Sequence, residues 1–229
     1  MSVEPSSDLS PQSGWNMVGR RVLVLAPHTD DAELACGGTM ARFQEEGAEL
    51  HLVAFSTATE SLPSGSEPDR LEQEFLNSSI GVLGIDANAI TVLDFRVRRF
   101  SERRQDLLES LVDARERVRP NLVLAPSGDD IHQDHWVVHR EAMRAFKETS
   151  MLCYEMPWNQ RTSVLNTFIA LQERHVAAKV DALQQYRSQL ELGRPYMSPE
   201  FIRSWAHVRG VQSGSEYAEA FELHLMVWS

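Results

Sequence analysis

The chain has 229 residues, of which 42% are hydrophobic and 24% are charged, and its formal net charge is -11. This length and composition fit one ordinary globular domain with a substantial core. The negative charge argues against nucleic acids and anionic membrane surfaces as partners, because both favour basic patches. No apolar stretch approaches the roughly 18 residues that a membrane-spanning helix requires.

The N-terminal stretch is polar and rich in Ser and Pro. It lacks the basic and apolar regions of a signal peptide, so we expect residues 1–18 to form a flexible leader and residues 19–229 to form a single domain. The two cysteines, Cys36 and Cys153, cannot form a disulfide framework and suit a reducing compartment. We therefore expect a cytoplasmic protein in which both cysteines are small buried hydrophobic residues.

Apolar runs and segments with helical spacing alternate along the first two thirds of the chain. In chain order, they predict a strand at 21–26, a helix at 32–46, a strand at 49–55, a helix at 70–83, a strand at 89–93, a helix at 102–118 and a strand at 121–125. Beyond residue 150 the pattern is weaker, with a strand near 152–156, a helix across 176–192 and a last strand at 223–227. Such alternation predicts an α/β fold, a Rossmann-like sandwich whose mostly parallel sheet carries helices on both faces.

Two dense polar clusters follow the first and fourth predicted strands. PHTDD occupies residues 27–31, and DDIHQDHWVVH occupies residues 129–139. In a doubly wound sheet with strand order 3-2-1-4-5, the first and fourth strands are neighbours, and the strand order reverses between them. Ligands bind at the carboxyl ends of the strands at such a point, so we expect both clusters to share one crevice.

The residue types in these clusters favour a metal site over a dinucleotide site. The first βα turn lacks the G-x-G-x-x-G pattern of dinucleotide-binding loops. Imidazole and carboxylate groups that converge from loops suit Zn²⁺ or Fe²⁺, and three protein ligands leave an open coordination position. A metal would also offset the repulsion between adjacent acids. The simpler alternative is that Asp30 or Asp31 only caps the helix that follows.

Both clusters resemble sequence motifs of a known enzyme family. PHTDDAELACGGTMARF is similar to the first motif of the LmbE-like, or PIG-L, family of metal-dependent N-acetyl-sugar deacetylases, A/P-H-P-D-D-x-E, and HQDH resembles its second motif, H-x-D-H. Looser matches occur at 70–74, 179–189 and 217–222. Thr29 stands where the family has Pro. Asp130 and Ile131 occupy the stretch where some members have a Tyr that acts as the general acid. The residue that protonates the leaving group is therefore not identified by the motif.

The resemblance implies roles for five polar residues of the two motifs. It implies that His28, Asp31 and His135 bind the metal, with Zn²⁺ or Fe²⁺ both compatible with these ligands. Asp30 would be the general base that deprotonates the attacking water, and His132 would stabilise the oxyanion as a cation or protonate the leaving amine.

A further histidine, His139, lies four residues after His135 and could share a helix face with it. It is either an additional ligand or a residue that packs behind the site.

Four charged residues are candidates for substrate contacts. By resemblance, Arg70 and Asp94 would contact sugar hydroxyls, although Arg70 could equally form an i,i+4 salt bridge with Glu74. Arg96 and Arg98, together with the neighbouring Arg99, would grip a phosphate or simply form a solvated loop.

A loop containing Trp158 and Arg161 is expected to lie over the site, where the aromatic face could stack on a sugar or base. The same residues could also serve only to anchor the loop.

Together, the residues and the resemblance predict a metal-dependent amide hydrolase that acts on a small N-acetylated amino sugar or its nucleotide-linked or conjugated form. Two alternatives remain open. One is an amidase for a thiol-conjugated glucosamine, and the other is a non-catalytic α/β module that holds a nucleotide sugar. Self-association into a homo-oligomer is compatible with either.

Overall fold

The structure is a computed structural model, and it describes residues 16–62, 67 and 69–227. Most of the expected leader therefore lies outside the described residues, although Met17 is buried against the core. Within the described residues, seven strands form one sheet in the order β3-β2-β1-β4-β5-β7-β6. Their bounds are β1 Arg21–His28, β2 Glu49–Ser56, β3 Ile90–Val92, β4 Leu122–Pro126, β5 Ser150–Tyr154, β6 Thr167–Leu171 and β7 Tyr217–Leu225.

The sheet is parallel over β1 to β5, and β7 and β6 extend it as antiparallel strands. The predicted order of the first five strands and the α/β fold are thereby confirmed. The order reverses between β1 and β4, whose residues Val22 and Leu122 are register partners. Both strands end at the same edge of the sheet, which is where ligands bind in folds of this kind.

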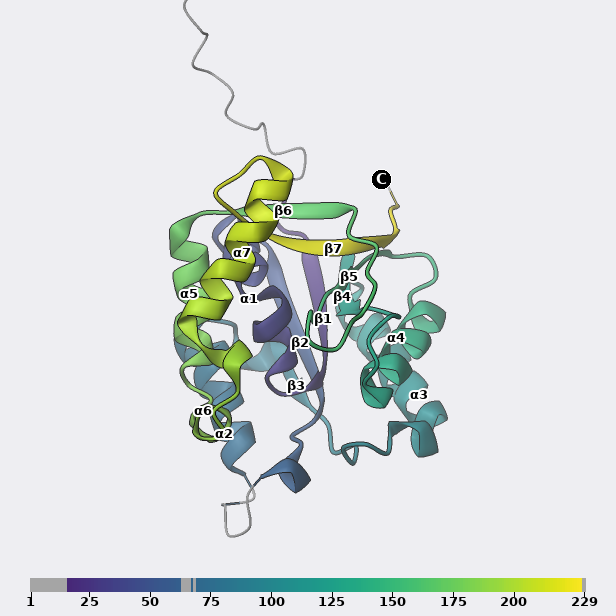
Figure 1. The fold of residues 1–229 in the computed structure, drawn as a ribbon. Helices are drawn as coiled ribbons and strands as arrows, with labels where there is room; N and C mark the ends of the chain where they lie inside the picture. The colour runs from purple at the N-terminus through teal and green to yellow at the C-terminus, as the bar shows by residue number, and fades with distance from the viewer. Residues whose placement is uncertain (1–15, 63–66, 68, 228–229) are drawn as a thin grey trace, which may run out of the picture.

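Helices cover both faces of the sheet (Figure 1). One face carries α1 Asp31–Glu45, α2 Arg70–Leu76, α5 Glu173–Leu183, α6 Arg187–Glu191 and α7 Pro199–Ser213, and the other carries α3 Arg104–Val118 and α4 Gln133–Ala145. Short helical turns lie at Thr59–Ser61, Ala87–Ala89, Phe100–Arg103 and Pro195–Met197, and a π-helical segment lies at Asn77–Val82. None of the helices in the described segments is long and apolar enough to cross a membrane.

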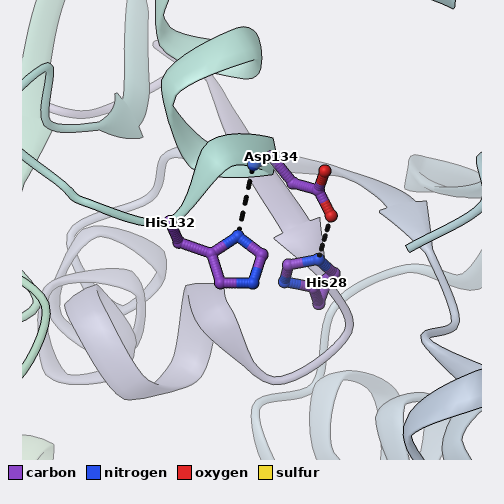
Figure 2. A group of neighbouring side chains, drawn as sticks. All are labelled: His28, His132 and Asp134. Atoms are coloured by element: carbon purple, nitrogen blue, oxygen red, sulfur yellow. Dashed lines mark hydrogen bonds and ion pairs between the residues drawn. The ribbon is translucent and has the colours of Figure 1, made fainter. Parts of the chain in front are cut away.

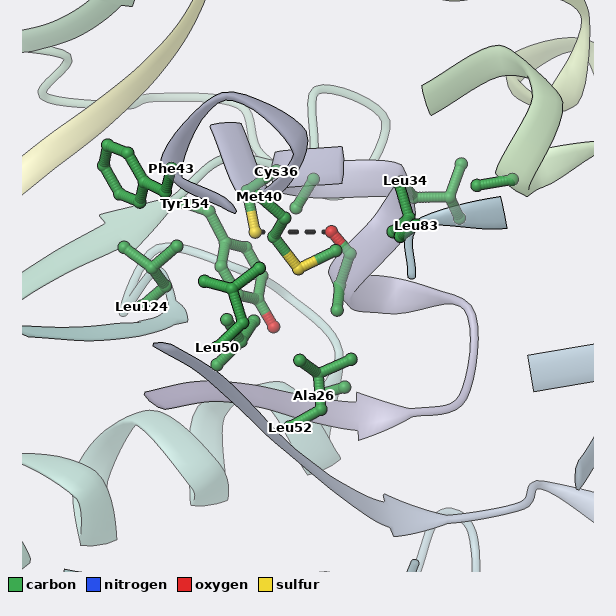
Figure 3. Close-up of a cluster of buried hydrophobic side chains, with 14 of the residues drawn as sticks. Ala26, Leu34, Cys36, Met40, Phe43, Leu50, Leu52, Leu83, Leu124 and Tyr154 are labelled. Atoms are coloured by element: carbon green, nitrogen blue, oxygen red, sulfur yellow. Dashed lines mark hydrogen bonds between the residues drawn. The ribbon is translucent and has the colours of Figure 1, made fainter. Parts of the chain in front are cut away.

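The continuous apolar run of β1 fills both halves of the core. Because successive side chains of a strand point to opposite faces, Val22, Val24 and Ala26 join the cluster under α1, whereas Leu23 and Leu25 join the cluster under α3 and α4. Figure 3 shows the first cluster, in which Ala26 and neighbouring leucines lie beneath the helix that carries Cys36 and Met40. Two-sided burial explains why this strand reads as an unbroken hydrophobic run.

The structure differs from the expected elements mainly after residue 150. The predicted helix across 176–192 is two helices, and the chain turns between them at Tyr186, whose buried hydroxyl donates to the carbonyl of Thr29. The last strand begins at Tyr217 instead of 223, and β6 and α7 were not predicted. Such half-buried edge elements carry a weaker hydrophobic pattern than the central strands.

The helix expected at 70–83 also changes character along its length. It is α-helical only as far as Leu76 and continues as a π-helical segment. The hydroxyls of Ser78 and Ser79 in this segment donate to the buried carboxyl of Glu33, at 3.0 and 2.7 Å. Irregular helical turns of this type are frequent at functional sites, and here the turn lets two hydroxyls reach the first part of α1.

Candidate metal centre

The two polar clusters meet at the carboxyl ends of β1 and β4. His28 is the last residue of β1, and Asp31 is the first residue of α1. From the other side, the loop after β4 leads into α4, whose first turn carries His135. All three side chains are buried. Residues more than one hundred positions apart therefore share one crevice, as the strand order predicts.

Three donor atoms converge between the two clusters. Asp31 Oδ2 lies 3.1 Å from His28 Nδ1 and 3.1 Å from His135 Nε2, and the two ring nitrogens are 3.4 Å apart. Ligands at about 2.0–2.1 Å from a tetrahedral Zn²⁺ would lie about 3.3 Å from one another. The three atoms thus have the spacing of one face of such a tetrahedron, and the arrangement fits a divalent cation.

Each of these histidines also contacts a second carboxylate through its other ring nitrogen. His28 Nε2 lies 3.1 Å from Asp134 Oδ2, and His135 Nδ1 lies 2.8 Å from Asp130 Oδ2. A metal-binding histidine usually donates its remaining N–H to such a group, which fixes the tautomer and the ring orientation. Asp134 therefore leaves Nδ1 of His28 as an acceptor that faces Asp31, and Asp130 does the same for Nε2 of His135.

Figure 2 shows a second group of potential ligands, His28, His132 and Asp134, that shares one histidine with the first. Its atoms are already engaged. Asp134 Oδ2 accepts the backbone N–H of Arg98 at 2.5 Å as well as the ring of His28, and His132 Nδ1 accepts the backbone N–H of Asp134 at 3.2 Å. Asp31 Oδ2 likewise accepts the backbone N–H of His28 at 2.8 Å, but all three residues of its group are buried and a further carboxylate orients each of its two histidines. The group around Asp31 is therefore the better candidate for a metal.

The electrostatics of the site favour a positive charge. Burial alone would lower the pKa of His135, but Asp31 and Asp130 outweigh it and raise that pKa to about 10. Burial would likewise raise the pKa of Asp31, but the two histidines hold it far below its usual range. In the absence of a cation His135 holds a proton on each ring nitrogen at neutral pH, so metal binding would release a proton from the site.

Asp30 lies beside this centre with its carboxyl facing the pocket. It occupies the N-cap position of α1, yet its side chain makes no capping hydrogen bond, so it does not play the capping role of the simpler alternative. Burial and the repulsion of Asp31 raise its pKa to about 6. The carboxyl is thus mostly ionised at neutral pH and more basic than an ordinary aspartate, as a general base requires.

His132 is the N-cap residue of α4, where its Nδ1 accepts the N–H of Asp134. The proton of the neutral ring therefore sits on Nε2. Burial and the positive fields of His135 and His28 lower the pKa of His132 to about 4. At neutral pH the ring is uncharged, so it offers an N–H donor in place of the cation considered from the sequence.

A pocket of about 200 Å³ opens next to the donor atoms. Its lining includes the predicted residues His28, Asp30, Asp31, His132 and His135. The opposite wall comes from the C-terminal part of the chain and from the loop after β5, and it contributes Trp158, Asn159, Gln189, Arg194 and Tyr196. The Trp158 and Tyr196 rings are stacked, with centroids 4.2 Å apart.

Of the predicted substrate contacts, Arg70 and Asp94 lie outside the set of described residues that line this pocket. The guanidinium of Arg70 donates to Glu74 at 3.1 Å and to Glu191 at 2.8 Å, which is the salt-bridge arrangement that its spacing allowed. Asp94 is exposed. The expected loop residue Arg161 is exposed as well, whereas its partner Trp158 is part of the pocket wall.

The arginine cluster borders the pocket through its backbone. Val97 lines the pocket, and the N–H of Arg98 is bonded to Asp134. The side chain of Arg96 pairs with Glu60 at 2.5 Å, and that of Arg99 pairs with Glu102 at 2.6 Å. The exposed Arg98 has a left-handed backbone, with φ of 66°, and the guanidinium is not part of either pair.

His139 and the two cysteines lie behind the centre and do not contribute to either ligand group. His139 Nδ1 is 2.9 Å from the carbonyl oxygen of Pro126, and its ring packs so closely on Gly128 that a Cβ there would come within 2.8 Å of Nε2. This contact supports the packing alternative for His139. Cys36 and Cys153 are both buried, as expected.

Sequence reasoning missed Asp130 and Asp134 as partners of the histidines, and it missed the wall formed by Arg194 and Tyr196. Asp134 stands inside the H-x-D-H motif, so the signal was present: a histidine that binds metal needs an acceptor for its second nitrogen. The contribution of Arg194 and Tyr196 depends on how the C-terminal segment folds back, which no local pattern specifies.

Comparison with known proteins agrees with these features. Residues 23–146, more than half of the chain, match the profile of the PIG-L family, described as GlcNAc-PI de-N-acetylase. The chain is 25% identical over 173 residues to the uncharacterized deacetylase YaiS of Escherichia coli, which covers 73% of this chain and 90% of the relative. It is 29% identical over 175 residues to a 1D-myo-inositol 2-acetamido-2-deoxy-alpha-D-glucopyranoside deacetylase of Streptomyces scabiei, covering 62% of this chain but only 52% of that enzyme.

Solved structures share the fold over most of the chain. The conserved protein TT1542 from Thermus thermophilus superposes with a TM-score of 0.74 at 26% identity, covering 91% of this chain and 96% of that one. The 4-carboxy-2-hydroxymuconate hydratase GalB from Pseudomonas putida superposes with a TM-score of 0.73 at 22% identity, covering 92% and 98%. Because one of these neighbours is named a hydratase, the fold does not by itself specify deacetylation. Taken with the profile match, the two motifs place the chain in the PIG-L family.

Proposed function

We propose that this protein is a metal-dependent deacetylase that removes the acetyl group from a small N-acetylated amino sugar or its conjugate. The observation that carries the proposal is the convergence of His28 Nδ1, Asp31 Oδ2 and His135 Nε2 beside Asp30 at the wall of one pocket. The family and the two relatives named above, one of which is named for an acetylated glucosaminyl substrate, support the same activity.

In this proposal, His28, Asp31 and His135 hold the metal, with Asp134 and Asp130 orienting the two rings. When bound, a divalent ion such as Zn²⁺ or Fe²⁺ supplies Lewis acidity, which polarises the amide carbonyl and makes water a stronger acid. The acidic surroundings of the three ligands would be neutralised in part by that charge.

The residues around the metal would divide the proton transfers. Asp30 accepts the proton of the attacking water, since its raised pKa of about 6 makes it a better base than a free aspartate. His132 donates its Nε2–H to the oxyanion that develops on the carbonyl oxygen. The proton held by Asp30 then passes to the leaving amine. In this proposal Asp30 is therefore also the leaving-group acid, and the tyrosine that serves some family members as the acid is not needed.

The pocket supports a substrate of about one sugar ring. Its volume of about 200 Å³ lies below the range of about 300–1,000 Å³ that drug-sized ligands occupy. The stacked Trp158 and Tyr196 rings offer an aromatic wall, on which the apolar face of a sugar packs well. A nucleotide or other conjugate would have to extend out of the pocket, past the segment with Val97 and Arg98.

The test is elemental analysis combined with acetate release from N-acetylglucosamine and its conjugates. His28→Ala, Asp31→Ala and His135→Ala should each lose metal and activity together, because an incomplete ligand set binds metal poorly. The exposed Asp129→Ala, in the loop after β4, serves as the control and should retain both. Full metal occupancy in all three ligand variants would refute the ligand assignment.

A further inference from the structure

Helix α1, which carries Asp31 at its start, is broken at Cys36. The φ and ψ angles of Cys36 are -138° and 25°, which interrupt the helix after little more than one turn. The axis of the segment from Asp31 to Ala35 is therefore not fixed by the longer helical segment that follows. Contacts from outside the helix must therefore hold this short first segment. Ser78 and Ser79 hold its Glu33 side chain from one side, and its end at Ala35 is held from another.

The second segment of α1 begins on the carboxylate of Glu219, which belongs to β7. Glu219 Oε1 accepts the N–H of Gly38 at 3.1 Å, and Oε2 accepts the N–H of Thr39 at 2.7 Å. The first N–H groups of a helix have no partner within the helix, and a carboxylate is favoured there by charge as well as by hydrogen bonding. Glu219 thus caps the helix at the break, from a residue far along the chain.

Lys179, from α5, completes the arrangement on the side of the first segment. Its Nζ lies 2.6 Å from Glu219 Oε1 and 3.5 Å from the carbonyl oxygen of Ala35, the last residue before the break. The Lys179 and Glu219 side chains are only 3% and 4% exposed. A buried ion pair is costly to desolvate and often adds little stability over apolar residues of the same size, so its presence calls for another role.

The helix backbone at the break packs tightly against Lys179, Glu219 and Leu171, which leaves little room for a side chain at Gly37 or Gly38. A Cβ at Gly37 would come within 3.0 Å of Lys179 Cγ, and one at Gly38 would come within 2.6 Å of a Leu171 methyl carbon and 3.2 Å of Glu219 Oε1. The two glycines after Cys36 therefore let the helix lie close to Leu171 and to the two charged side chains. The ion pair and the two glycines thus contact each other at the point where the helix is interrupted.

Lys179 also contacts the opposite wall of the pocket through two aromatic rings. Its Nζ lies 4.6 Å from the ring centroid of Trp205, which packs edge-on against Trp158 with centroids 5.9 Å apart. Trp158 lines the pocket. The same ammonium group thus contacts the helix that carries Asp31 and the aromatic layer that faces it.

We infer that Lys179 and Glu219 are positioning residues, which fix the break in α1 and thereby set Asp31 at the spacing that the metal centre requires. Neither residue reaches the donor atoms, so both act through the backbone of α1. The inference rests on the proposed metal centre. It concerns how that centre is aligned, and not which substrate it acts on.

The test separates alignment from stability by removing both charges together. Lys179→Met/Glu219→Leu keeps the side-chain volume, so the protein should remain folded, but the N–H groups of Gly38 and Thr39 lose their acceptor. We expect the dissociation constant for Zn²⁺, measured by chelator competition, to rise about tenfold, as it does when supporting contacts of metal ligands are removed. The absorption bands of the Co²⁺-substituted protein should shift as well.

A matched control is available on the other face of the sheet, where Arg104 pairs with the buried Glu141. Arg104→Met/Glu141→Leu should leave both metal affinity and the Co²⁺ spectrum unchanged. Gly38→Ala keeps both charges but places a Cβ against Leu171 and Glu219 at the break, so it should also weaken metal binding.

If Lys179→Met/Glu219→Leu or, should it fail to fold, Gly38→Ala binds metal with wild-type affinity and spectrum, the inference is overturned. Failure of the unmodified protein to bind metal would instead overturn the proposed function.

Discussion

Asp134→Asn is the change that tests most sharply how the centre is organised. Both carboxylate oxygens of Asp134 face donors: Oδ2 meets His28 Nε2 at 3.1 Å and the N–H of Arg98 at 2.5 Å, and Oδ1 meets the N–H of Phe100 at 3.3 Å. An asparagine has one oxygen and one NH₂ group. In either orientation the NH₂ group would face an N–H donor, so the substitution breaks at least one hydrogen bond of a fully buried side chain.

The structure sets the size of the two expected effects. A buried donor left without a partner costs about 1–3 kcal/mol, so the metal-free variant should unfold with a free energy lower by that amount. Weaker control of the His28 ring should reduce metal affinity about 10- to 100-fold, which corresponds to about 1.4–2.7 kcal/mol. Urea unfolding of the metal-free protein measures the first effect, and chelator competition with Zn²⁺ measures the second.

Asp129→Asn provides the control, since it removes the same charge from an exposed side chain five residues earlier. Long-range electrostatics alone would weaken metal binding similarly in both variants. If Asp134→Asn retained wild-type affinity, or lost no more than Asp129→Asn, then Asp134 would not orient His28 and the reasoning about the outer carboxylates would be refuted.

Three further predictions concern a buried acid, the general base and the arginine cluster. Burial raises the pKa of Glu33 from 4.5 to about 7, so the folded state holds this proton more tightly than the unfolded state. Between about pH 5 and pH 8 the metal-free wild type should therefore lose about 2–3 kcal/mol of unfolding free energy relative to Glu33→Gln, and parallel curves in urea titrations would contradict this. Asp30→Asn should keep the metal but lose most acetate release, because an amide cannot accept the proton of water; loss of the metal in this variant, with retention in Asp31→Asn, would exchange the two roles. Arg96→Gln/Arg98→Gln should raise KM for a nucleotide-linked or phosphorylated sugar and leave that for the free sugar almost unchanged, whereas equal changes for both substrates would make the arginines structural.

Much of the fold could be predicted because the central strands are buried on both faces. The run from Val22 to Ala26 and its counterpart in β4 are apolar throughout, and the strand order then follows from the rules for parallel sheets. The two polar clusters stand directly after these strands, which is why the clusters could be brought together from the sequence, whereas the choice of His28, Asp31 and His135 within them came from the family resemblance. Their pairing needs only the topology of the sheet.

The rest depends on contacts that local patterns do not encode. Arg194 and Tyr196 reach the pocket only because the chain turns at Tyr186 and passes beside Trp158. Arg70 carried a substrate role by resemblance, yet its guanidinium is bonded to Glu74 and to Glu191, and the distant position of Glu191 in the chain gave no sign of this contact. The break in α1 could not be predicted either, because the carboxylate that caps its second segment belongs to Glu219 on β7, far along the chain.

Acetate release under metal control tests the central claim most directly. The purified protein would be incubated with N-acetylglucosamine and a panel of its glycosides, phosphates and nucleotide forms, and acetate and free amine would both be quantified. The account predicts that at least one substrate yields acetate and amine in equal amounts, that a chelator abolishes the reaction, and that Zn²⁺ or Fe²⁺ restores it in the wild type but not in His135→Ala. Turnover that survives complete metal removal, or a metal-loaded protein that releases acetate from no member of the panel, would contradict it.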